Sequence, residues 1–325
     1  MPVSREEVCG AYRLLLGREP ESEDVIAAHQ AEPDIDSLGR RLLRSEEFRR
    51  RLVRETASAN APKWVCTEIP HGLRLWVDLS DAGVSAGCLQ GNWEPTETDL
   101  ILSLLSPGDT FIDVGANIGW FTLLAAHAVG GSGKVYAFEP RTDRRARLEQ
   151  SIAENGFETR CVVEAAALGT TACDTTLGWV PSERNPGHSF IMPSAPIEGA
   201  ETIETISVRA LDSFNIPGPV RLIKIDVEGA EPQAIAGAME LITRDRPILL
   251  LELFPQWLSA VSNITTLDFV NRLRGFGYRV HRLAKYGIGR ELFSGDDGIE
   301  SGGPEYFSVV AMSEADRNCS TPGLT

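Results

Sequence analysis

Cysteine and long apolar runs are scarce in this chain of 325 residues. None of the six cysteines forms a C-x-x-C pair and no histidine cluster accompanies them, which argues against a structural zinc site and a disulfide scaffold. The N-terminus has no apolar signal core, and no stretch reaches the roughly 20 apolar residues that span a bilayer. We therefore expect a reduced, cytoplasmic protein with no membrane partner.

Positive charge is also in deficit, since 31 Lys and Arg residues face 46 Asp and Glu residues and leave a net charge of −15. An acidic surface repels phosphate backbones, so we expect no nucleic-acid partner. The hydrophobic fraction of 42% and the charged fraction of 24% are typical of a globular protein. The length favours two domains, or one large domain with an appendage.

The first 60 residues predict a small helical module. Ser4 and Glu7 form the S-x-x-E pattern of a capping box ahead of an apolar-periodic run, and further helices are expected around residues 24–30 and 37–54. The segments YRLLLGREPE and LLRSEEFRRRL resemble a helical module found in some bacterial glycosyltransferases and methyltransferases. We expect residues 1–60 to serve in docking or oligomerisation, with a homodimer as one form of assembly.

The rest of the chain, residues 61–325, predicts an α/β domain that begins with a β-hairpin of residues 63–69 and 73–79. From Thr110 onward, strand and helix patterns alternate, which predicts a mostly parallel sheet with helices on both faces. Ligands bind such sheets outside the carboxyl ends of the strands, where the strand order reverses. The seven expected strands are TFIDVG, KVYAFEP, CVVEAAAL, VRLIKIDV, RPILLLELF, YRVHRL and EYFSVVAM.

The strongest motif is FIDVGANIG, residues 111–119, in which a strand ends and a helix begins. Asp113 places a carboxylate at the strand end, and Gly115 and Gly119 allow tight turning and close approach to a ligand. A dinucleotide fingerprint needs G-x-G-x-x-G, but Asn117 stands where the middle glycine would be. This disfavours NAD, and Asp113 suits the ammonium group of S-adenosylmethionine (SAM) better.

Glu139 lies at the end of the next strand, VYAFEP, where a carboxylate can accept both ribose hydroxyls of an adenosine ligand. NAD enzymes share this geometry, so Glu139 supports an adenosine ligand without choosing which one. A lone acidic residue at a strand end is more often solvated, but the pairing with Asp113 strengthens the signal. The candidate cofactor-binding residues are Asp113, Gly115, Asn117, Gly119, Glu139, Glu164 and Asp226.

The strand LIKIDV carries ionisable residues where a central parallel strand is normally apolar. Side-chain alternation places Lys224, Asp226 and Glu228 on one side, which indicates a strand end that opens into a site. Glu231 precedes Pro232, which fits the first position of the next helix. The alternative for Glu228 and Glu231 is that they only stabilise the start of that helix.

Four separated segments, FIDVGANIGWFTLLAA, VYAFEP, LIKIDVEGAEPQAIAGA and RPILLLE, closely resemble the FkbM-type methyltransferases in order and spacing. The resemblance implies a Rossmann-like class I methyltransferase fold and SAM as the cofactor. It also implies O-methylation, so the expected partner is a small hydroxyl acceptor, either polyketide-like or a sugar. The residues that it implies near SAM are Asp113, Gly115, Asn117 and Glu139, and those near the methyl group are Lys224, Asp226 and Glu228.

The stretch 181–200 is long and rich in Pro, Ser and Gly, and we interpret it as an acceptor-binding lid. Asp226 is the first candidate for the general base and His188, within this stretch, is the second. Lys224 and Glu228 complete the candidate catalytic set. A divalent cation is an alternative that we do not favour, because no D-x-x-D-N-type run is present; its oxygen ligands would be Asp226, Glu228 and Glu231.

Two other classes of function stay open. An NAD-linked oxidoreductase has a similar sheet but needs the glycine fingerprint that this chain lacks. A non-catalytic interaction protein would have the helical module as its working part. The intact pair of Asp113 and Glu139 argues against that second class.

Overall fold

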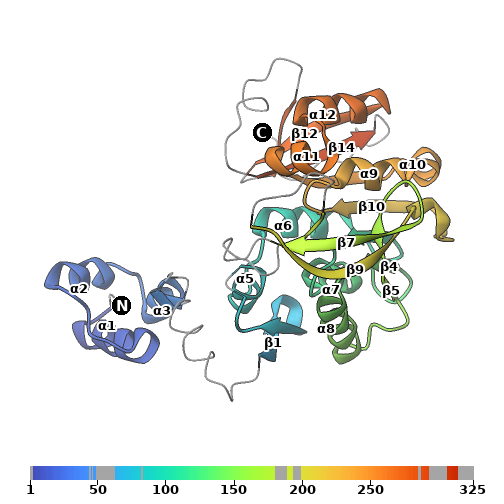
Figure 1. The fold of residues 1–325 in the computed structure, drawn as a ribbon. Coiled ribbons are helices and arrows are strands. Elements are labelled where there is room, and N and C mark those ends of the chain that lie inside the picture. The colour runs from blue at the N-terminus through green and yellow to red at the C-terminus, as the bar shows by residue number, and fades with distance from the viewer. Residues whose placement is uncertain are drawn as a thin grey trace. The chain divides into compact units, whose positions relative to one another are not determined.

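The computed structural model divides the chain into two compact units (Figure 1). One unit comprises Met1–Val65 and Val77–Asn92, and the other comprises Cys66–Trp76 and Trp93–Thr325. Within the described part of the chain, no helix is long and apolar enough to cross a membrane. The described residues are 3–43, 45, 47–48, 63–81, 83–179, 189–192, 199–284, 287–292 and 306–313.

The N-terminal helices form an apolar core of their own. The Oγ atom of Ser4 accepts the backbone N–H of Glu7 and the Glu7 carboxylate accepts that of Ser4, so the predicted capping box is confirmed. Most of the predicted extension of the third helix to residue 54 lies outside the described residues. The helices are α1 (Arg5–Ala11), a π-helical turn (Tyr12–Leu16), α2 (Glu23–Gln30) and α3 (Ile35–Leu43). Their buried cluster comprises Val3, Val8, Tyr12, Leu16, Ile26, Leu38 and Leu42.

The predicted hairpin region is confirmed as a two-stranded sheet of β1 (Trp64–Ile69) and β2 (Leu73–Asp78). A 3-10 turn (Pro70–Gly72) joins the strands, and His71 takes a positive φ of 67° there. Helix α5 (Val84–Leu89) follows in the chain.

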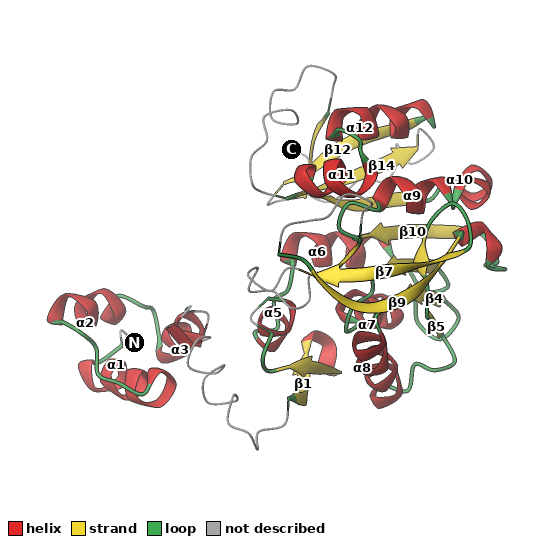
Figure 2. Cartoon of the chain, viewed as in Figure 1, coloured by secondary structure: helices red, strands yellow, loops and turns green. Residues whose placement is uncertain are grey.

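A mixed eight-stranded sheet forms the centre of the second unit (Figure 2). The strand order is β13-β12-β14-β11-β10-β3-β4-β5. The strands from β11 to β5 pair in parallel, whereas β14 runs antiparallel to β11 and β12. All seven predicted strands are present, and the additional edge strand is β13. The bounds are β3 (Thr110–Val114), β4 (Lys134–Phe138), β5 (Cys161–Glu164), β10 (Val220–Ile225), β11 (Ile248–Leu253), β12 (Tyr278–Ala284), β13 (Gly287–Glu291) and β14 (Phe307–Ser313).

The order of the strands reverses between β3 and β10. The chain runs outward from β3 to β4 and β5, then crosses back to β10 on the other side of β3 and continues to β11. This doubly wound arrangement confirms the Rossmann-like fold. The expected ligand site therefore lies at the carboxyl ends of β3 and β10, the neighbouring strands from which the chain continues in opposite directions across the sheet.

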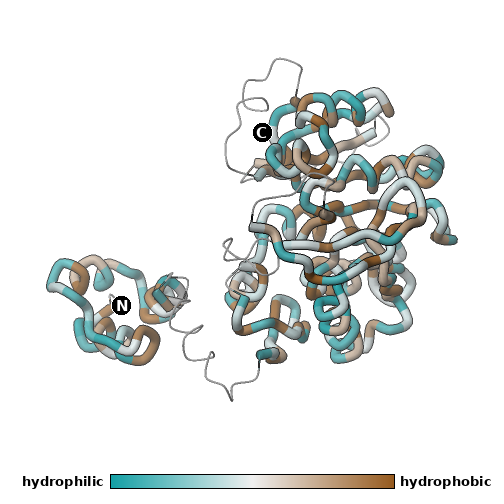
Figure 3. Tube along the Cα trace, in the orientation of Figure 1, coloured by the Kyte–Doolittle hydropathy of each residue, from teal (hydrophilic) through white to brown (hydrophobic). Residues whose placement is uncertain are grey.

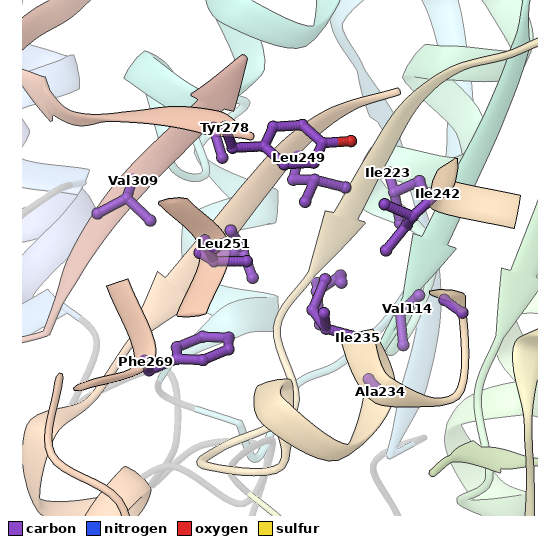
Figure 4. Packing of buried hydrophobic residues seen from close by; sticks show 14 of the residues in the cluster. Val114, Ile223, Ala234, Ile235, Ile242, Leu249, Leu251, Phe269, Tyr278 and Val309 are labelled. Atoms are coloured by element: carbon purple, nitrogen blue, oxygen red, sulfur yellow. The ribbon is translucent and has the colours of Figure 1, made fainter. Parts of the chain in front are cut away.

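Helices cover both faces of the large sheet. On one face, α9 to α12 pack over an apolar cluster whose strand residues include Val114, Ile223, Leu249 and Leu251 (Figure 4). On the other, α7 packs on β3 and β4, and α8 on β5. Figure 3 shows hydrophilic and hydrophobic residues interspersed along α12, as expected of a helix with one buried face. The helices are α6 (Pro95–Leu104), α7 (Trp120–Ala128), α8 (Thr142–Glu154), α9 (Glu231–Ala236), α10 (Met239–Asp245), α11 (Pro255–Ser262) and α12 (Thr266–Gly275).

A second sheet, with the strand order β6-β9-β7-β8, occupies a region where the sequence predicts one strand and then irregular structure. The predicted strand CVVEAAAL divides into β5 and the short β6. The ring of Phe190 in β8 lies 4.4 Å from that of Trp257 in α11, which connects this sheet to the helical layer. The bounds are β6 (Ala167–Leu168), β7 (Cys173–Trp179), β8 (Phe190–Ile191) and β9 (Glu201–Arg209).

Candidate active site

Asp113 presents a carboxylate near the carboxyl end of β3. The side chain is fully buried, and its Oδ2 atom accepts a hydrogen bond from Thr122 Oγ1 at 2.6 Å. Its Oδ1 atom has no hydrogen-bond partner among the described residues. Burial raises the pKa of Asp113, although the positive charge of Lys224 opposes that effect. A buried acceptor of this kind is costly unless a ligand supplies the donor.

The turn between β3 and α7 leaves no room for a side chain at Gly115. Its φ is 83°, and a Cβ atom would lie 2.0 Å from the carbonyl oxygen of Asp226. The close approach seen at Gly115 is to the backbone after β10, whereas the predicted approach to a ligand stays a prediction. Asn117 also has a positive φ, 50°, and its buried Oδ1 atom has no partner within the described chain. Gly119, with φ of 100°, caps the start of α7.

Glu139 follows β4 and directs its carboxylate toward this turn. Oε2 accepts the backbone N–H of Asn117 and Oε1 accepts that of Arg141, each at 2.8 Å. Burial raises the pKa of Glu139 to about 7, even though both hydrogen bonds favour the charged form. Glu164 ends β5, and its backbone carbonyl accepts the N–H of Glu139 at 3.1 Å. The structure thus brings these two predicted residues together through the main chain.

Lys224 lies between Asp113 and a second group of carboxylates. In the sheet it pairs with Asp113 of β3 and with Leu250 of β11, and it is buried. Its Nζ atom donates to Asp226 Oδ2 at 2.9 Å and lies 4.6 Å from the centre of the Phe121 ring. Burial lowers the pKa of Lys224, but the surrounding carboxylates, Asp226 first among them, outweigh burial and hold that pKa above its ordinary value.

The predicted strand that carries Lys224 was too long. Strand β10 ends at Ile225, and Glu228 adopts a left-handed conformation with φ of 53° in the loop that follows. Strand alternation therefore does not extend to Glu228. Glu231 Oε1 accepts the N–H groups of Val227 and Gly229, each at 3.2 Å, and so closes this loop at the start of α9. Burial raises the pKa of Glu231 to about 8.

Two carboxylates that the sequence analysis missed lie beside Asp226. Glu94 precedes α6 and Glu252 belongs to β11, and one carboxylate oxygen from each of the three residues lies within 4.8 Å of the others. Glu252 is 8% exposed, and Glu94 Oε2 is buried with no hydrogen-bond partner among the described residues. Burial raises the pKa of Glu94 to about 8. Burial, Asp226 and Glu94 together raise that of Glu252 well above its ordinary value.

An aromatic pair lies near this acidic cluster. The rings of Phe254 and Tyr306 stack with their centres 5.0 Å apart. Burial and the charges of Glu252 and Glu94 raise the pKa of Tyr306 to about 12, so its phenol keeps its proton at neutral pH. The sequence did hold a signal for Glu252, which is the one acidic residue in the otherwise apolar run ILLLEL. The only sequence signal that Glu94 belongs to a site is its place directly before Pro95, which starts helix α6.

The predicted acceptor lid falls mostly outside the described residues. Within the stretch 181–200, the structure describes residues 189–192 and 199–200. His188 is not among them, so its part as a base stays a prediction.

Comparison with known proteins gives consistent matches. A family model described as the methyltransferase FkbM domain matches residues 113–280. The chain is 32% identical over 201 residues to the 31-O-demethyl-FK506 methyltransferase FkbM of Streptomyces tacrolimicus, which covers 53% of this chain and 76% of that protein. It is 31% identical over 147 residues to the hexuronic acid methyltransferase AglP of Haloferax volcanii, covering 43% of this chain and 56% of that protein.

Among solved structures, methyltransferase FkbM from Methylobacillus flagellatus matches with a TM-score of 0.42 and 18% identity, covering 65% of this chain and 47% of that one. The family match contains the turn after β3, Glu139, the pair of Lys224 and Asp226, and Glu252. Only Glu94 of the clustered carboxylates lies before it. The matched region holds the reversal in strand order and all of these carboxylates except Glu94. On this match, the chain belongs to the FkbM family of SAM-dependent methyltransferases.

Proposed function

We propose that the chain transfers the methyl group of SAM to a hydroxyl group of a small natural product or sugar. The observation that carries the proposal is the row of carboxylates, Asp113, Glu139, Asp226 and Glu252, at the carboxyl ends of four adjacent strands. The names of two relatives add support, since one acts on 31-O-demethyl-FK506 and the other on a hexuronic acid. Both named substrates are small molecules.

The residues of the β3 and β4 ends fit SAM. Asp113 Oδ1 and Asn117 Oδ1 are buried acceptors without a partner among the described residues, and both suit the donors of a ligand ammonium group. The Glu139 carboxylate has lone pairs beyond the two that its backbone hydrogen bonds use, and these can accept ribose hydroxyls. When bound, SAM supplies a methyl group already activated on a sulfonium sulfur.

The residues of the β10 and β11 ends suit the acceptor. Asp226 is the candidate base because its side chain keeps 24% of its surface exposed, whereas Lys224 beside it keeps 4%. The acceptor oxygen forms a bond to the methyl carbon as the bond from that carbon to sulfur breaks, with its electron pair left on sulfur. Asp226 takes the hydroxyl proton and later releases it to water. Lys224 holds Asp226 in place through the ion pair, so the chain mainly aligns the two reactants.

Calorimetric titration with SAM, S-adenosylhomocysteine and NAD tests the cofactor half. We expect the first two to bind and NAD to give no heat of binding. As a matched pair, Glu139→Gln should weaken SAM binding, whereas Glu154→Gln, at an exposed position of α8, should not. Binding of NAD without binding of SAM would favour the oxidoreductase alternative and overturn the proposal.

A second experiment tests transfer to oxygen. The protein is incubated with SAM that carries an isotopic label in its methyl group, together with panels of polyketide-like and sugar acceptors. Labelled products are analysed by mass spectrometry before and after mild base, because a methyl ether survives base and a methyl ester does not. Label that is found only in base-labile esters or in N-methyl products would contradict O-methylation of a hydroxyl.

A further inference from the structure

We propose that Glu94, Asp226 and Glu252 bind one hard divalent cation on the acceptor side of the site. This cation site is separate from the cofactor residues Asp113 and Glu139. The proposal deepens the proposed function. The role of the cation rests on that function, because a cation there would bind the acceptor hydroxyl. Its existence can be tested without any methyl transfer.

The spacing of the three carboxylates suits a single ion. One oxygen from each residue lies within 4.8 Å of the other two. Calcium binds oxygens at about 2.3–2.6 Å, so two ligands on opposite sides of the ion lie roughly 4.6–5.2 Å apart. Magnesium binds at about 2.0–2.1 Å, so its ligand oxygens would lie closer together than those of calcium. Carboxylate oxygens favour these ions and Mn²⁺ over softer metals.

The burial of these groups points to a missing partner. Glu252 is only 8% exposed, and one of its carboxylate oxygens belongs to the cluster. Glu94 Oε2 is inaccessible to solvent and has no hydrogen-bond partner in the part of the chain that the structure describes. Ionised carboxylates that are buried without a donor are strongly unfavourable, whereas coordination of a metal satisfies them. A cation would therefore satisfy the Glu94 oxygen, for which the described residues supply no hydrogen-bond donor.

The charge balance agrees with a divalent ion. Lys224 forms its ion pair with Asp226 Oδ2 at 2.9 Å, and its ammonium group also lies over the ring of Phe121. It therefore sits to one side of the cluster, toward β3 and α7. Coordination of a metal requires all three carboxylates to be ionised. In that state, one ammonium leaves two negative charges, which one divalent cation neutralises.

The proposed ligands differ from the set that the sequence suggested. Glu231 uses its Oε1 atom to close the loop at the start of α9, and Glu228 lies beyond the end of β10. Glu94 and Glu252 take their places beside Asp226. The proposal departs from the expectation that no metal is needed, and that expectation stays untested. A cation at this point would lower the pKa of a bound acceptor hydroxyl.

Binding of Mn²⁺ in the absence of SAM tests the site. Free Mn²⁺ is measured by electron paramagnetic resonance during titration of the wild-type chain, Glu252→Gln, Glu94→Gln and the control Glu154→Gln. We expect one tight Mn²⁺ in the wild type and in the control. In each cluster variant the affinity of that site should fall by roughly tenfold or more, because one ligand charge is lost. Mg²⁺ and Ca²⁺ should displace the bound Mn²⁺.

Equal stoichiometry and affinity in the wild type and both cluster variants would overturn the proposal. Circular dichroism establishes that each variant is folded, and if Glu252→Gln fails to fold, Glu94→Gln at its less buried position decides the question. Failure of the proposed function is distinguishable, since it would appear as absent SAM binding or absent methyl transfer. Neither SAM binding nor methyl transfer is needed to measure the binding of Mn²⁺.

Discussion

The pH dependence of SAM binding gives the sharpest test of the cofactor side. Burial raises the pKa of Glu139 to about 7 in the free protein, whereas ribose hydroxyls and the two backbone N–H groups need the carboxylate as an acceptor. Binding should therefore release a proton near neutral pH and strengthen as pH rises. The ionised fraction of such a group falls from about nine-tenths at pH 8 to about one-tenth at pH 6, so the Kd should be roughly tenfold higher at pH 6.

Calorimetry at pH 6, 7 and 8 in buffers of different ionisation enthalpy measures both the Kd and the protons released. Glu139→Gln serves as the reference, because the amino group of SAM titrates equally with both proteins and the difference isolates Glu139. The variant should bind more weakly at pH 8, by about 1–3 kcal/mol for lost charged hydrogen bonds. Its Kd should lack the tenfold pH dependence. An identical pH dependence in both proteins would refute the assignment of Glu139 to the ribose.

The same group predicts a trend in stability without ligand. Its folded-state pKa lies above the ordinary value of 4.5, so its contribution to stability is complete below pH 4.5 and is lost as pH rises through 7. The difference between these values corresponds to about 3 kcal/mol. Between pH 5 and pH 8, the loss of stability in urea unfolding should be larger in the wild type than in Glu139→Gln by roughly this amount, because the other buried carboxyls, Glu94 and Glu231 among them, contribute equally in both proteins. A common slope in both proteins would show that Glu139 is solvated.

Three further perturbations probe other parts of the chain. Asp226→Asn should lower turnover by about 10²–10⁴-fold, the usual range for a general base, with SAM affinity unchanged; wild-type turnover at saturating substrates would exclude Asp226 as base and as cation ligand. Gly115→Ala should lower the free energy of unfolding by more than about 1 kcal/mol, because of its positive φ and the contact with the Asp226 backbone, whereas Gly131→Ala, which meets open space, should not. Deletion of residues 1–60 should leave SAM affinity nearly unchanged in calorimetry; aggregation would show instead that these helices cover the catalytic core.

Sequence patterns could place the groups at the strand ends because parallel strands end at a common edge. Asp113, Glu139, Lys224 and Asp226 each come at or just after the end of a strand whose apolar periodicity is plain. The structure brings Lys224 into register with Asp113. The positions of these groups at the strand ends therefore follow from the sequence. Their roles in binding and catalysis stay predictions.

Other features depend on contacts between distant segments, which no local pattern reports. Glu252 faces Asp226 only because β11 pairs with β10, and Glu94 reaches them from a segment before the sheet. The apolar pattern from residue 231 to residue 242 has no interruption, but α9 and α10 are separated at Gly237, whose Cβ would lie 2.0 Å from the carbonyl oxygen of Gly169. The second sheet was missed because β6 and β8 have only two residues each, and because the sequence between Trp179 and Glu201 is rich in Pro, Ser and Gly.

The position of Glu94 ahead of β3 has a consequence for how acceptor preference can change. The part of the chain that matches the family begins at residue 113, so Glu94, one of the three proposed cation ligands, lies outside it. Substitutions around the start of α6 can reshape that side while the turn after β3 keeps its sequence. A library of variants in residues 92–97 should therefore shift the acceptors that the enzyme accepts before it alters the affinity for the methyl donor.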